Sequence, residues 1–283
     1  MADKIALITG CSNGFGLLTS VELAKAGYRV VATMRDLSRR AKLDQAVVSA
    51  GVSDNIDVRA LDVTHFGEIG PCVDSLVRDY GRIDVLVNNA GFAMAGFAED
   101  IKLEELRTQF ETNFFGAVAM TKAVLPTMRK QRSGHIIQVS SIVGLQGSIT
   151  VSSYSASKHA LEGWSESLRL EVNGLGIKVV LVEPGAFDTG VWAVGARMGE
   201  EAKKDTSPNF QRSLRMREVI QKIPKADPIL VARVIVAIAQ DSNPKLRYLV
   251  GRDAKIQLRL KRILPWKMYE KMIANFLKID KNT

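Results

Sequence analysis

The sequence predicts an α/β fold: a doubly wound, Rossmann-type parallel sheet within a single domain. Short apolar, β-branched runs recur along the chain, and segments with helical periodicity separate most of them. Strands that alternate with helices are typical of a parallel sheet covered on both faces. A glycine-rich turn also follows the first run directly, before a helical segment. We expect strands at 5–8, 30–33, 56–60, 85–87, 136–139, 179–182 and, more weakly, 247–250.

The helical segments between these runs have recognisable patterns and ends. The first, Leu17–Ala26, has apolar residues at helical spacing and stops at Gly27, a typical C-terminal cap. Two longer stretches, 103–132 and 152–174, are also predicted to be helical. We find no internal repeat and no low-complexity linker, so residues 1–251 are expected to form one domain.

Two segments depart from the alternation. Residues 186–226 contain several glycines, Pro208 and many charges, and a long insertion after the carboxyl end of a strand is a common place for a substrate lid. Residues 252–283 form a basic amphipathic pattern that is divided by Pro265. This tail could pack on its own domain, cover the substrate cleft or make weak contact with an anionic membrane surface.

Composition limits the class of protein. The chain has 283 residues, 46% of them hydrophobic, and a formal net charge of +9. The chain lacks an arginine-rich tract interleaved with aromatics, so nucleic acid is the least favoured partner. We also recognise no signal-peptide pattern, apolar stretch of membrane-spanning length or pattern of metal ligands, so none of these is expected, and the two cysteines suit a reducing compartment. The expected location is the cytoplasm.

The segment Thr9–Gly16 reads TGCSNGFG and lies between the first strand and the first helix. In such a turn the backbone N–H groups point at a pyrophosphate. Gly10 would permit the tight turn, Gly14 would allow close approach of the phosphates, and Gly16 would let the helix pack against the strand. A purely structural glycine turn is the alternative.

A second group of residues points to proton transfer. Tyr154 and Lys158 are four residues apart and would share one face of a helix. A nearby ammonium favours the phenolate, so Lys158 is expected to lower the pKa of Tyr154. Ser140 and Ser141 close an apolar strand at the sheet edge where ligands bind. A surface aromatic–cation pair is the alternative interpretation.

Taken in order, these motifs resemble the short-chain dehydrogenase/reductase family over about residues 4–250. The glycine turn, Asn88–Gly91 after a strand, the serine pair, Tyr-x3-Lys and Pro184-Gly185 appear with the family's spacings. The resemblance implies hydride transfer between a nicotinamide cofactor and a carbonyl or alcohol carbon, and makes 1–251 a dinucleotide-binding catalytic domain. It also implies a homodimer or homotetramer.

The resemblance assigns roles to individual residues. Tyr154 would donate or accept the proton, Lys158 would hold the nicotinamide ribose, and Ser141, rather than Ser140, would bind the substrate oxygen. Asn113 would hold a proton-relay water. The cofactor-binding residues implied are Gly10, Ser12, Asn13, Gly14, Phe15, Gly16, Arg35, Asp62, Val63, Asn89, Ala90, Gly91, Tyr154, Lys158, Pro184, Gly185 and Thr189.

The end of the second strand bears on the choice of cofactor. An acid at the strand tip would accept from a ribose 2′-hydroxyl, whereas an arginine can pair with a 2′-phosphate. Met34 occupies the acid position, Arg35 follows it, and Asp36 comes two positions late. The sequence therefore favours NADP(H) over NAD(H), although Asn13 stands where many NADP-preferring relatives have a basic residue.

The substrate end is expected to involve 92–97, 142–151 and 191–198, which are mostly apolar. They favour an apolar ketone, aldehyde or alcohol, as in the branch that contains 17β-hydroxysteroid and retinol dehydrogenases. Three alternatives stay open: a 3-oxoacyl-thioester reductase, a non-catalytic NADP(H)-sensing protein and a membrane-surface scaffold.

Overall fold

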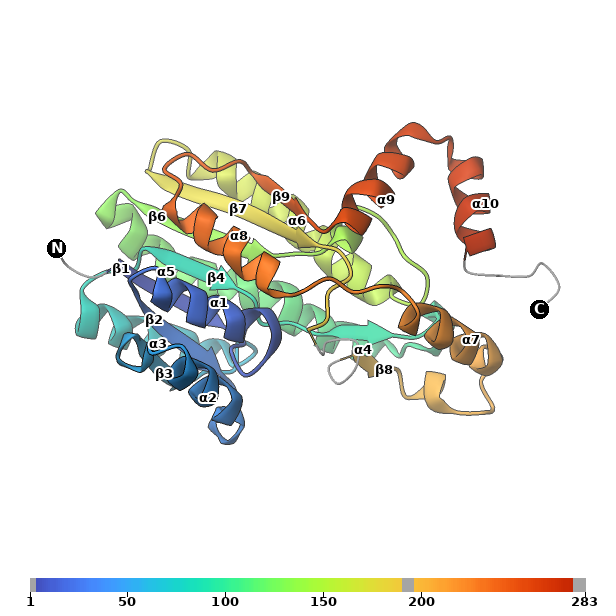
Figure 1. Cartoon of the computed structure of the whole chain (residues 1–283), viewed down its shortest axis with the longest axis horizontal. Coiled ribbons are helices and arrows are strands. Elements are labelled where there is room, and N and C mark those ends of the chain that lie inside the picture. The colour runs from blue at the N-terminus through green and yellow to red at the C-terminus, as the bar shows by residue number, and fades with distance from the viewer. Residues whose placement is uncertain (1–3, 190–195, 277–283) are drawn as a thin grey trace.

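The computed structural model describes residues 4–189 and 196–276, and its centre is a sheet of seven parallel strands (Figure 1). Each of the seven predicted strands is present, so the doubly wound fold is confirmed. The strands, in spatial order, are β3 (Ile56–Ala60), β2 (Tyr28–Met34), β1 (Lys4–Thr9), β4 (Val85–Asn88), β6 (Gly134–Val139), β7 (Ile177–Pro184) and β9 (Arg247–Val250).

The strand order creates the position of the site. From β1 the chain first builds outward through β2 and β3, then returns to the other side of β1 with β4. At this reversal the connections after β1 and β4 leave the sheet in opposite directions. A crevice therefore opens at the carboxyl ends of β1 and β4, which is where ligands bind in open α/β sheets.

Helices cover both faces because successive strand side chains alternate. Ala6 and Ile8 pack in one core with residues of α1, α2 and α8, whereas Ile5 and Leu7 pack in a second core with residues of α3, α5 and α6. The helices of the first face are α1 (Gly14–Lys25), α2 (Ala41–Ser49) and α8 (Ile229–Gln240), and those of the second are α3 (Phe66–Tyr80), α5 (Gly116–Gln131) and α6 (Ser152–Glu171).

The predicted helical stretch 103–132 is helical but not uniform. It consists of α4 (Leu103–Phe110) and α5, joined by a turn of π-helix at Glu111–Phe115. π-Helical turns within α-helices occur frequently at functional sites, and this one contains Asn113.

The lid and tail segments lie beyond the carboxyl edge of the sheet. In the lid, β8 (Ala196–Met198) pairs in parallel with β5 (Ala93–Ala95), and α7 (Phe210–Gln221) follows. In the tail, α9 (Arg252–Ile263) and α10 (Trp266–Phe276) flank Pro265 and stand out from the sheet (Figure 1). Among the described residues, no helix combines the length and apolar character needed to cross a membrane.

Candidate active site

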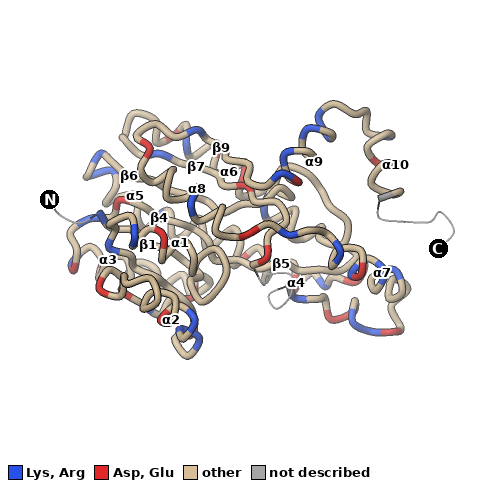
Figure 2. The backbone as a smooth tube through the Cα atoms, in the orientation of Figure 1, with Lys and Arg blue, Asp and Glu red and all other residues tan. Residues whose placement is uncertain are grey.

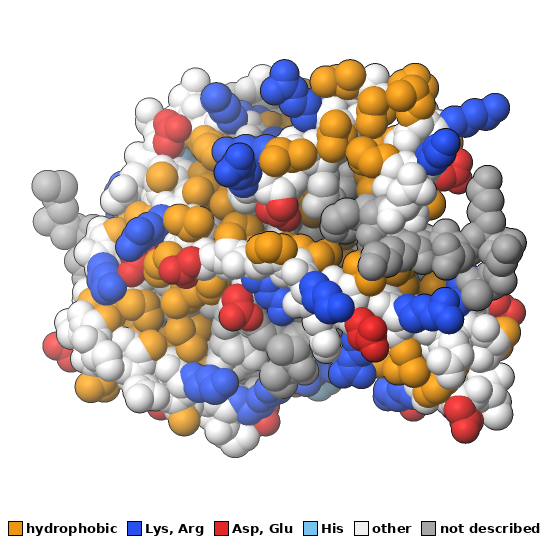
Figure 3. Space-filling view, turned by 45° about the vertical axis from the view of Figure 1, so that its right-hand side comes forward, with side chains coloured by type: hydrophobic (Ala, Val, Ile, Leu, Met, Phe, Trp, Pro, Cys, Tyr) orange, Lys and Arg blue, Asp and Glu red, His pale blue; other side chains and the backbone are white. Residues whose placement is uncertain are grey.

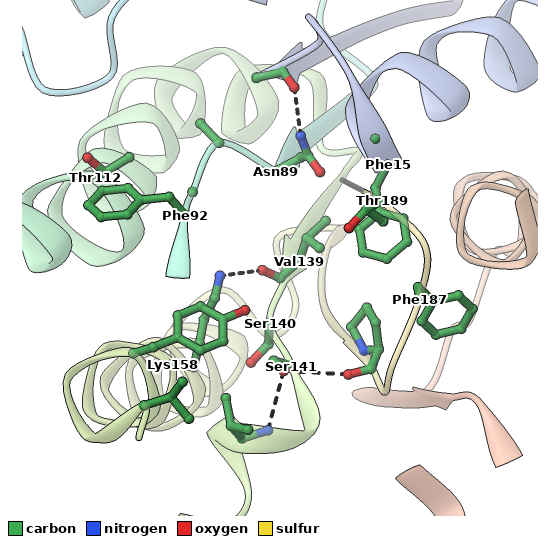
Figure 4. A pocket seen from close by; sticks show the side chains of 18 of the residues that line it. Phe15, Asn89, Phe92, Thr112, Val139, Ser140, Ser141, Lys158, Phe187 and Thr189 are labelled. Atoms are coloured by element: carbon green, nitrogen blue, oxygen red, sulfur yellow. Dashed lines mark hydrogen bonds between the residues drawn. The ribbon is translucent and has the colours of Figure 1, made fainter. Parts of the chain in front are cut away.

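A cavity of about 570 Å³ opens at the carboxyl edge of the sheet. It is lined by all the predicted catalytic and cofactor-binding residues except Gly16 and Asn113. Lys158, Ser140 and Ser141 lie at one side of it, and Phe15, Thr189 and Asn89 lie around the other (Figure 4). The structure thus brings together residues separated by up to about two thirds of the chain.

The glycine turn has the geometry of a phosphate cradle. Gly10 has φ +74°, and a Cβ there would lie 2.8 Å from the Cα of Ala90. Gly14 has φ +57°, and α1 begins at this residue, so the first N–H groups of the helix face the cavity. Gly16 does not line the cavity. A Cβ on it would overlap with the Gly10 carbonyl and the Asn89 side chain, so its role is to keep the turn close to β4.

Asn89 ties this turn to the end of β4. Its Nδ2 donates to the carbonyls of Thr9 and Gly10 at 2.9 and 3.0 Å, and its N–H donates to Thr9 Oγ1 at 3.0 Å. The two strand ends on either side of the reversal are therefore fixed relative to each other. This rigidity preorganises the backbone donors of the turn.

Two arginines lie at the end of the cavity opposite Tyr154, and the sequence identified only one of them. Arg35 and Arg39 both line this end. Asp36, the acid between them, instead caps a short turn, because its Oδ1 accepts from Ser38 N–H at 3.0 Å and from Ser38 Oγ at 2.6 Å. These hydrogen bonds lower the pKa of Asp36. The anionic side chain is thus directed into the turn, and the cationic side chains face the cavity.

Asp62 lies at the same end. Burial alone would raise the pKa of its carboxyl, but hydrogen bonds from Thr64 N–H and Thr64 Oγ1 to Oδ1, at 3.0 and 2.8 Å, leave the pKa lowered. Arg35 and His65 add to the lowering. Asp62 therefore remains an ionised acceptor that its neighbours hold in a fixed orientation.

Tyr154, Lys158 and Ser141 meet at the opposite end of the cavity, as their spacing predicts. Tyr154 and Lys158 lie one turn apart on α6, and the Lys158 Nζ is 5.8 Å from the centre of the tyrosine ring. Lys158 donates to the Val139 carbonyl at 2.8 Å (Figure 4). The Ser141 hydroxyl is hydrogen-bonded to Tyr154 and also accepts from Val143 N–H at 3.3 Å.

The protonation of this group differs from the sequence-based expectation. Burial raises the pKa of Tyr154 to about 12, and only the hydrogen bond with Ser141 opposes it. Burial also lowers the pKa of Lys158 to about 8, while the charge of Glu162 acts in the opposite direction. In this arrangement desolvation outweighs the expected effect of Lys158 on Tyr154, so at neutral pH the phenol carries its proton.

Asn113 supports the cavity wall from behind. Its Oδ1 accepts from Phe92 N–H at 3.1 Å, and its Nδ2 donates to the Phe92 carbonyl at 3.0 Å and to Ser157 Oγ at 3.1 Å. The side chain is 1% exposed. The π-helical turn thus places Asn113 where it fixes the backbone that follows β4 and also contacts α6.

A partly buried ionic cluster lies behind Lys158, and the sequence reasoning missed it. Arg247 contacts Glu162 at 3.0 Å, Glu166 at 2.7 Å and Glu183 at 3.1 Å, and the side chain of Glu183 is 1% exposed. Burial and the charge of Glu162 raise the pKa of Glu183 to about 8, although Arg247 opposes this. The spacing of Tyr154, Lys158, Glu162 and Glu166 along one face of α6 is a signal that could have revealed the cluster.

The substrate end of the cavity has more contributors than the sequence predicts. Of the predicted ranges 92–97, 142–151 and 191–198, the residues that line the cavity are Phe92, Ile142, Val143, Ser148, Ile149, Val151 and Arg197. The Arg197 guanidinium lies 4.4 Å from the centre of the Phe92 ring. Residues 190–195 lie outside the described part of the chain. Further lining residues come from α4, the π-helical turn, the segment around the end of α7, and α9: Thr108, Thr112, Ile220, Ile223, Lys225, Asp253 and Gln257.

Asp253 explains the need for glycine at position 185. Its Oδ2 accepts from Ala186 N–H at 2.8 Å, and a Cβ on Gly185 would overlap with this carboxylate. The first turn of α9 therefore holds the Pro184–Ala186 segment against the cavity. No cluster of acidic, histidine and cysteine side chains suited to a metal ion occurs in residues 4–189 or 196–276.

Known proteins similar to this chain are oxidoreductases. Residues 4–198 match the model of the short chain dehydrogenase family. An uncharacterized oxidoreductase, YusZ of Bacillus subtilis, is 41% identical over 280 residues, which is 98% of this chain and 99% of YusZ. Retinol dehydrogenase 8 of Bos taurus is 39% identical, covering 87% of this chain and 81% of the enzyme. A 3-ketodihydrosphingosine reductase of Bacteroides thetaiotaomicron is 39% identical, with 89% of each chain covered.

Solved structures agree with this assignment. A short-chain dehydrogenase from Streptomyces avermitilis superposes with a TM-score of 0.80 at 32% identity and covers 99% of both chains. A metagenomic short-chain oxidoreductase in complex with NADP has a TM-score of 0.69 at 26% identity, with 87% of this chain and 96% of that chain covered.

Proposed function

The chain belongs to the short-chain dehydrogenase/reductase family of oxidoreductases, and we propose that it reduces the carbonyl group of an apolar substrate with NADPH. One observation carries the proposal: Tyr154, Ser141 and Lys158 line the same cavity as the glycine turn. A proton donor and a cradle for a nicotinamide dinucleotide are thereby combined in one cleft.

The residues present fit such a cofactor. The Cβ-free positions at Gly10 and Gly14 and the start of α1 suit a pyrophosphate, and Asp62 suits the adenosine. Lys158 would hold the nicotinamide ribose, and Thr189 with Pro184-Gly185 would hold the carboxamide. When bound, the reduced cofactor supplies a hydride to the substrate carbon.

Tyr154 and Ser141 would handle the substrate oxygen. The Ser141 hydroxyl would donate a hydrogen bond to the carbonyl and polarise it, while the Tyr154 phenol would deliver a proton to the oxygen as it gains negative charge. Because burial raises the pKa of Tyr154, the phenol carries the proton that reduction of a carbonyl requires. Lys158 would supply positive charge beside the phenolate that forms. The side chain of Asn113 is engaged by Phe92 and Ser157 behind the cavity wall, so it would support the site by fixing these two neighbours.

Preference for NADPH over NADH would come from the arginine pair. Arg35 and Arg39 line the far end of the cavity, where a ribose 2′-phosphate would lie, while Asp36 points into its own turn. Two guanidinium groups favour a phosphate dianion through charge-assisted hydrogen bonds. Arg39 strengthens the preference inferred from Arg35 alone.

The substrate would be a largely apolar ketone or aldehyde. Ile142, Ile149 and Ile223 are among the residues that line the substrate end. Two of the relatives are named for retinol and for ketodihydrosphingosine, compounds that consist mostly of hydrocarbon. The family resemblance also supports a homodimer or homotetramer, which light scattering would measure.

The test is NADPH oxidation against a panel of apolar ketones and aldehydes, with wild type beside Tyr154→Phe. We expect turnover in wild type, a loss of about 10²–10⁴-fold in the variant at saturating NADPH, and NADPH binding by both proteins. Turnover that persists undiminished in Tyr154→Phe would rule out the proposed proton donor. NADPH binding without turnover of any compound would favour a cofactor-sensing protein.

A further inference from the structure

The two tail helices present a cationic and apolar surface to solvent. On α9, Arg252, Ile256, Arg259 and Ile263 follow one another at spacings of four and three residues, so they share one face. All four are exposed. Blue segments mark Lys and Arg positions along α9 in Figure 2, and in Figure 3 orange and blue side chains alternate along the upper right of the molecule.

The charge on this surface has one dominant sign. Within residues 252–275, six cationic side chains are exposed against a single exposed acid, Glu270. The cations are Arg252, Lys255, Arg259, Arg262, Lys267 and Lys271. Large apolar side chains lie among them: Ile263 is 66% exposed, Trp266 65% and Met268 58%. We call the exposed residues of 252–271 the tail surface.

The opposite side of the same helices belongs to the catalytic domain. Ala254 and Leu258 are buried against Ile142 and Val143. Gln257 is hydrogen-bonded to Gln146 at 2.9 Å, and Lys261 donates to the Leu145 carbonyl at 2.7 Å. These contacts fix α9 to the loop that lines the substrate end of the cavity, and Asp253 and Gln257 themselves line it.

We propose that the tail surface docks the protein on an anionic lipid bilayer, with the substrate end of the cavity held next to the membrane. Cationic residues interleaved with exposed Trp, Met and Ile are the pattern of a helix that lies in the interface between headgroups and acyl chains. Charge complementarity selects an anionic surface, and the exposed Ile263, Trp266 and Met268 side chains suit insertion among acyl chains. The role in substrate delivery rests on the proposed function, because it assumes an apolar carbonyl substrate that partitions into membranes. The docking itself is independent of the proposed function.

Flotation of the full chain with vesicles tests the docking without any catalytic readout. The vesicles are phosphatidylcholine alone or phosphatidylcholine with phosphatidylglycerol. We expect recovery with the anionic vesicles only, decreasing as salt is raised. Each cation near an anionic surface contributes about fivefold to binding, so Lys255→Glu/Arg259→Glu/Arg262→Glu is expected to weaken binding by at least 100-fold. Lys42→Glu/Arg78→Glu/Lys130→Glu, which makes the same charge change on α2, α3 and α5, is the matched control.

Further variants and probes distinguish a lipid bilayer from an acidic protein partner or a second copy of the chain. Ile263→Ser/Met268→Ser keeps every charge and is expected to weaken vesicle binding about tenfold or more, because it removes the apolar insertion. The emission of Trp266 is expected to shift to shorter wavelength on anionic vesicles, and Trp266→Phe removes that shift. Equal recovery of the tail and control variants would overturn the proposal. It would also be overturned if soluble polyglutamate bound as tightly and Ile263→Ser/Met268→Ser had no effect, which would indicate an acidic protein partner, or if the tail variants changed the oligomeric state, which would indicate a second copy.

Discussion

The two ends of the cavity are built in different ways. At the cofactor end, the lining comes from short turns directly after β1, β2, β3 and β4, and backbone geometry decides what fits: the positive φ of Gly10 and Gly14 and the hydrogen bonds of Asn89. At the substrate end, the lining side chains come from the residue before β5, from α4, from the loop before α6, from the lid and from α9. The first end is built from backbone turns that fit closely against one another at the sheet edge, and the second from side chains of several packed elements. A fold of this kind can therefore retain its cofactor while its substrate changes.

The largest effect is expected from a substitution that displaces the backbone of the glycine turn and so weakens NADPH binding. In Gly16→Ala, the new Cβ overlaps with the Gly10 carbonyl, so the turn must move away from β4. We expect the dissociation constant for NADPH, measured by calorimetry, to rise by about 100-fold or more. Gly67→Ala is the control, since a Cβ at Gly67 in α3 meets nothing within 4 Å. Unchanged NADPH binding in Gly16→Ala would contradict the cradle.

The second prediction concerns Arg35 and Arg39 and the preference for NADPH over NADH. Arg35→Ala and Arg39→Ala each remove one guanidinium from the region proposed for the 2′-phosphate. We expect each to lower the NADPH/NADH affinity ratio by about 10- to 50-fold, which corresponds to one charge-assisted contact. Arg40→Ala serves as the control, because Arg40 pairs with Asp44 and does not line the cavity. If the ratio is the same in all three variants, the NADP(H) preference does not come from this pair.

A smaller effect tests the substrate end. Ile223, just beyond the end of α7, lines the cavity and is not among the residues proposed to hold the cofactor. Ile223→Ser is expected to raise KM about fivefold for long-chain ketones, because one apolar contact is lost, while KM for short ketones and the affinity for NADPH stay unchanged. An equal change for short and long substrates would place Ile223 outside the substrate site.

The smallest effect is a shift in pH dependence. Burial lowers the pKa of Lys158 to about 8, and the negative charge of Glu162 opposes this lowering. Reductase activity is thus expected to fall above about pH 8 as the ammonium is lost. In Glu162→Gln this support disappears, so the fall should begin at lower pH. Glu166→Gln, which also removes a carboxylate from Arg247 but is half exposed, should leave the profile unchanged. A shift to higher pH in Glu162→Gln would contradict the sign of the coupling.

The same contrast explains what the sequence could predict. The seven strands, the glycine turn and the Tyr154–Lys158 pair are recognisable because each depends on residues close together in the chain. Arg39 was missed because a short turn brings it back to the cavity, and Gln257 because α9 reaches the cavity only through tertiary packing. The prediction that Lys158 lowers the pKa of Tyr154 is wrong for a related reason, because burial raises this pKa. Spacing shows that a charge is near, but only the fold shows how much water is excluded.

The most direct test of the central claim is isotope transfer. A ketone that the enzyme reduces would be incubated with NADPH carrying deuterium at the transferable C4 position, and the alcohol analysed by mass spectrometry, for wild type and Tyr154→Phe at equal NADPH occupancy. The account predicts one deuterium on the carbinol carbon with wild type and a transfer rate lower by about 10²–10⁴-fold with Tyr154→Phe. Alcohol formed without deuterium, or transfer at equal rates in the two proteins, would contradict it.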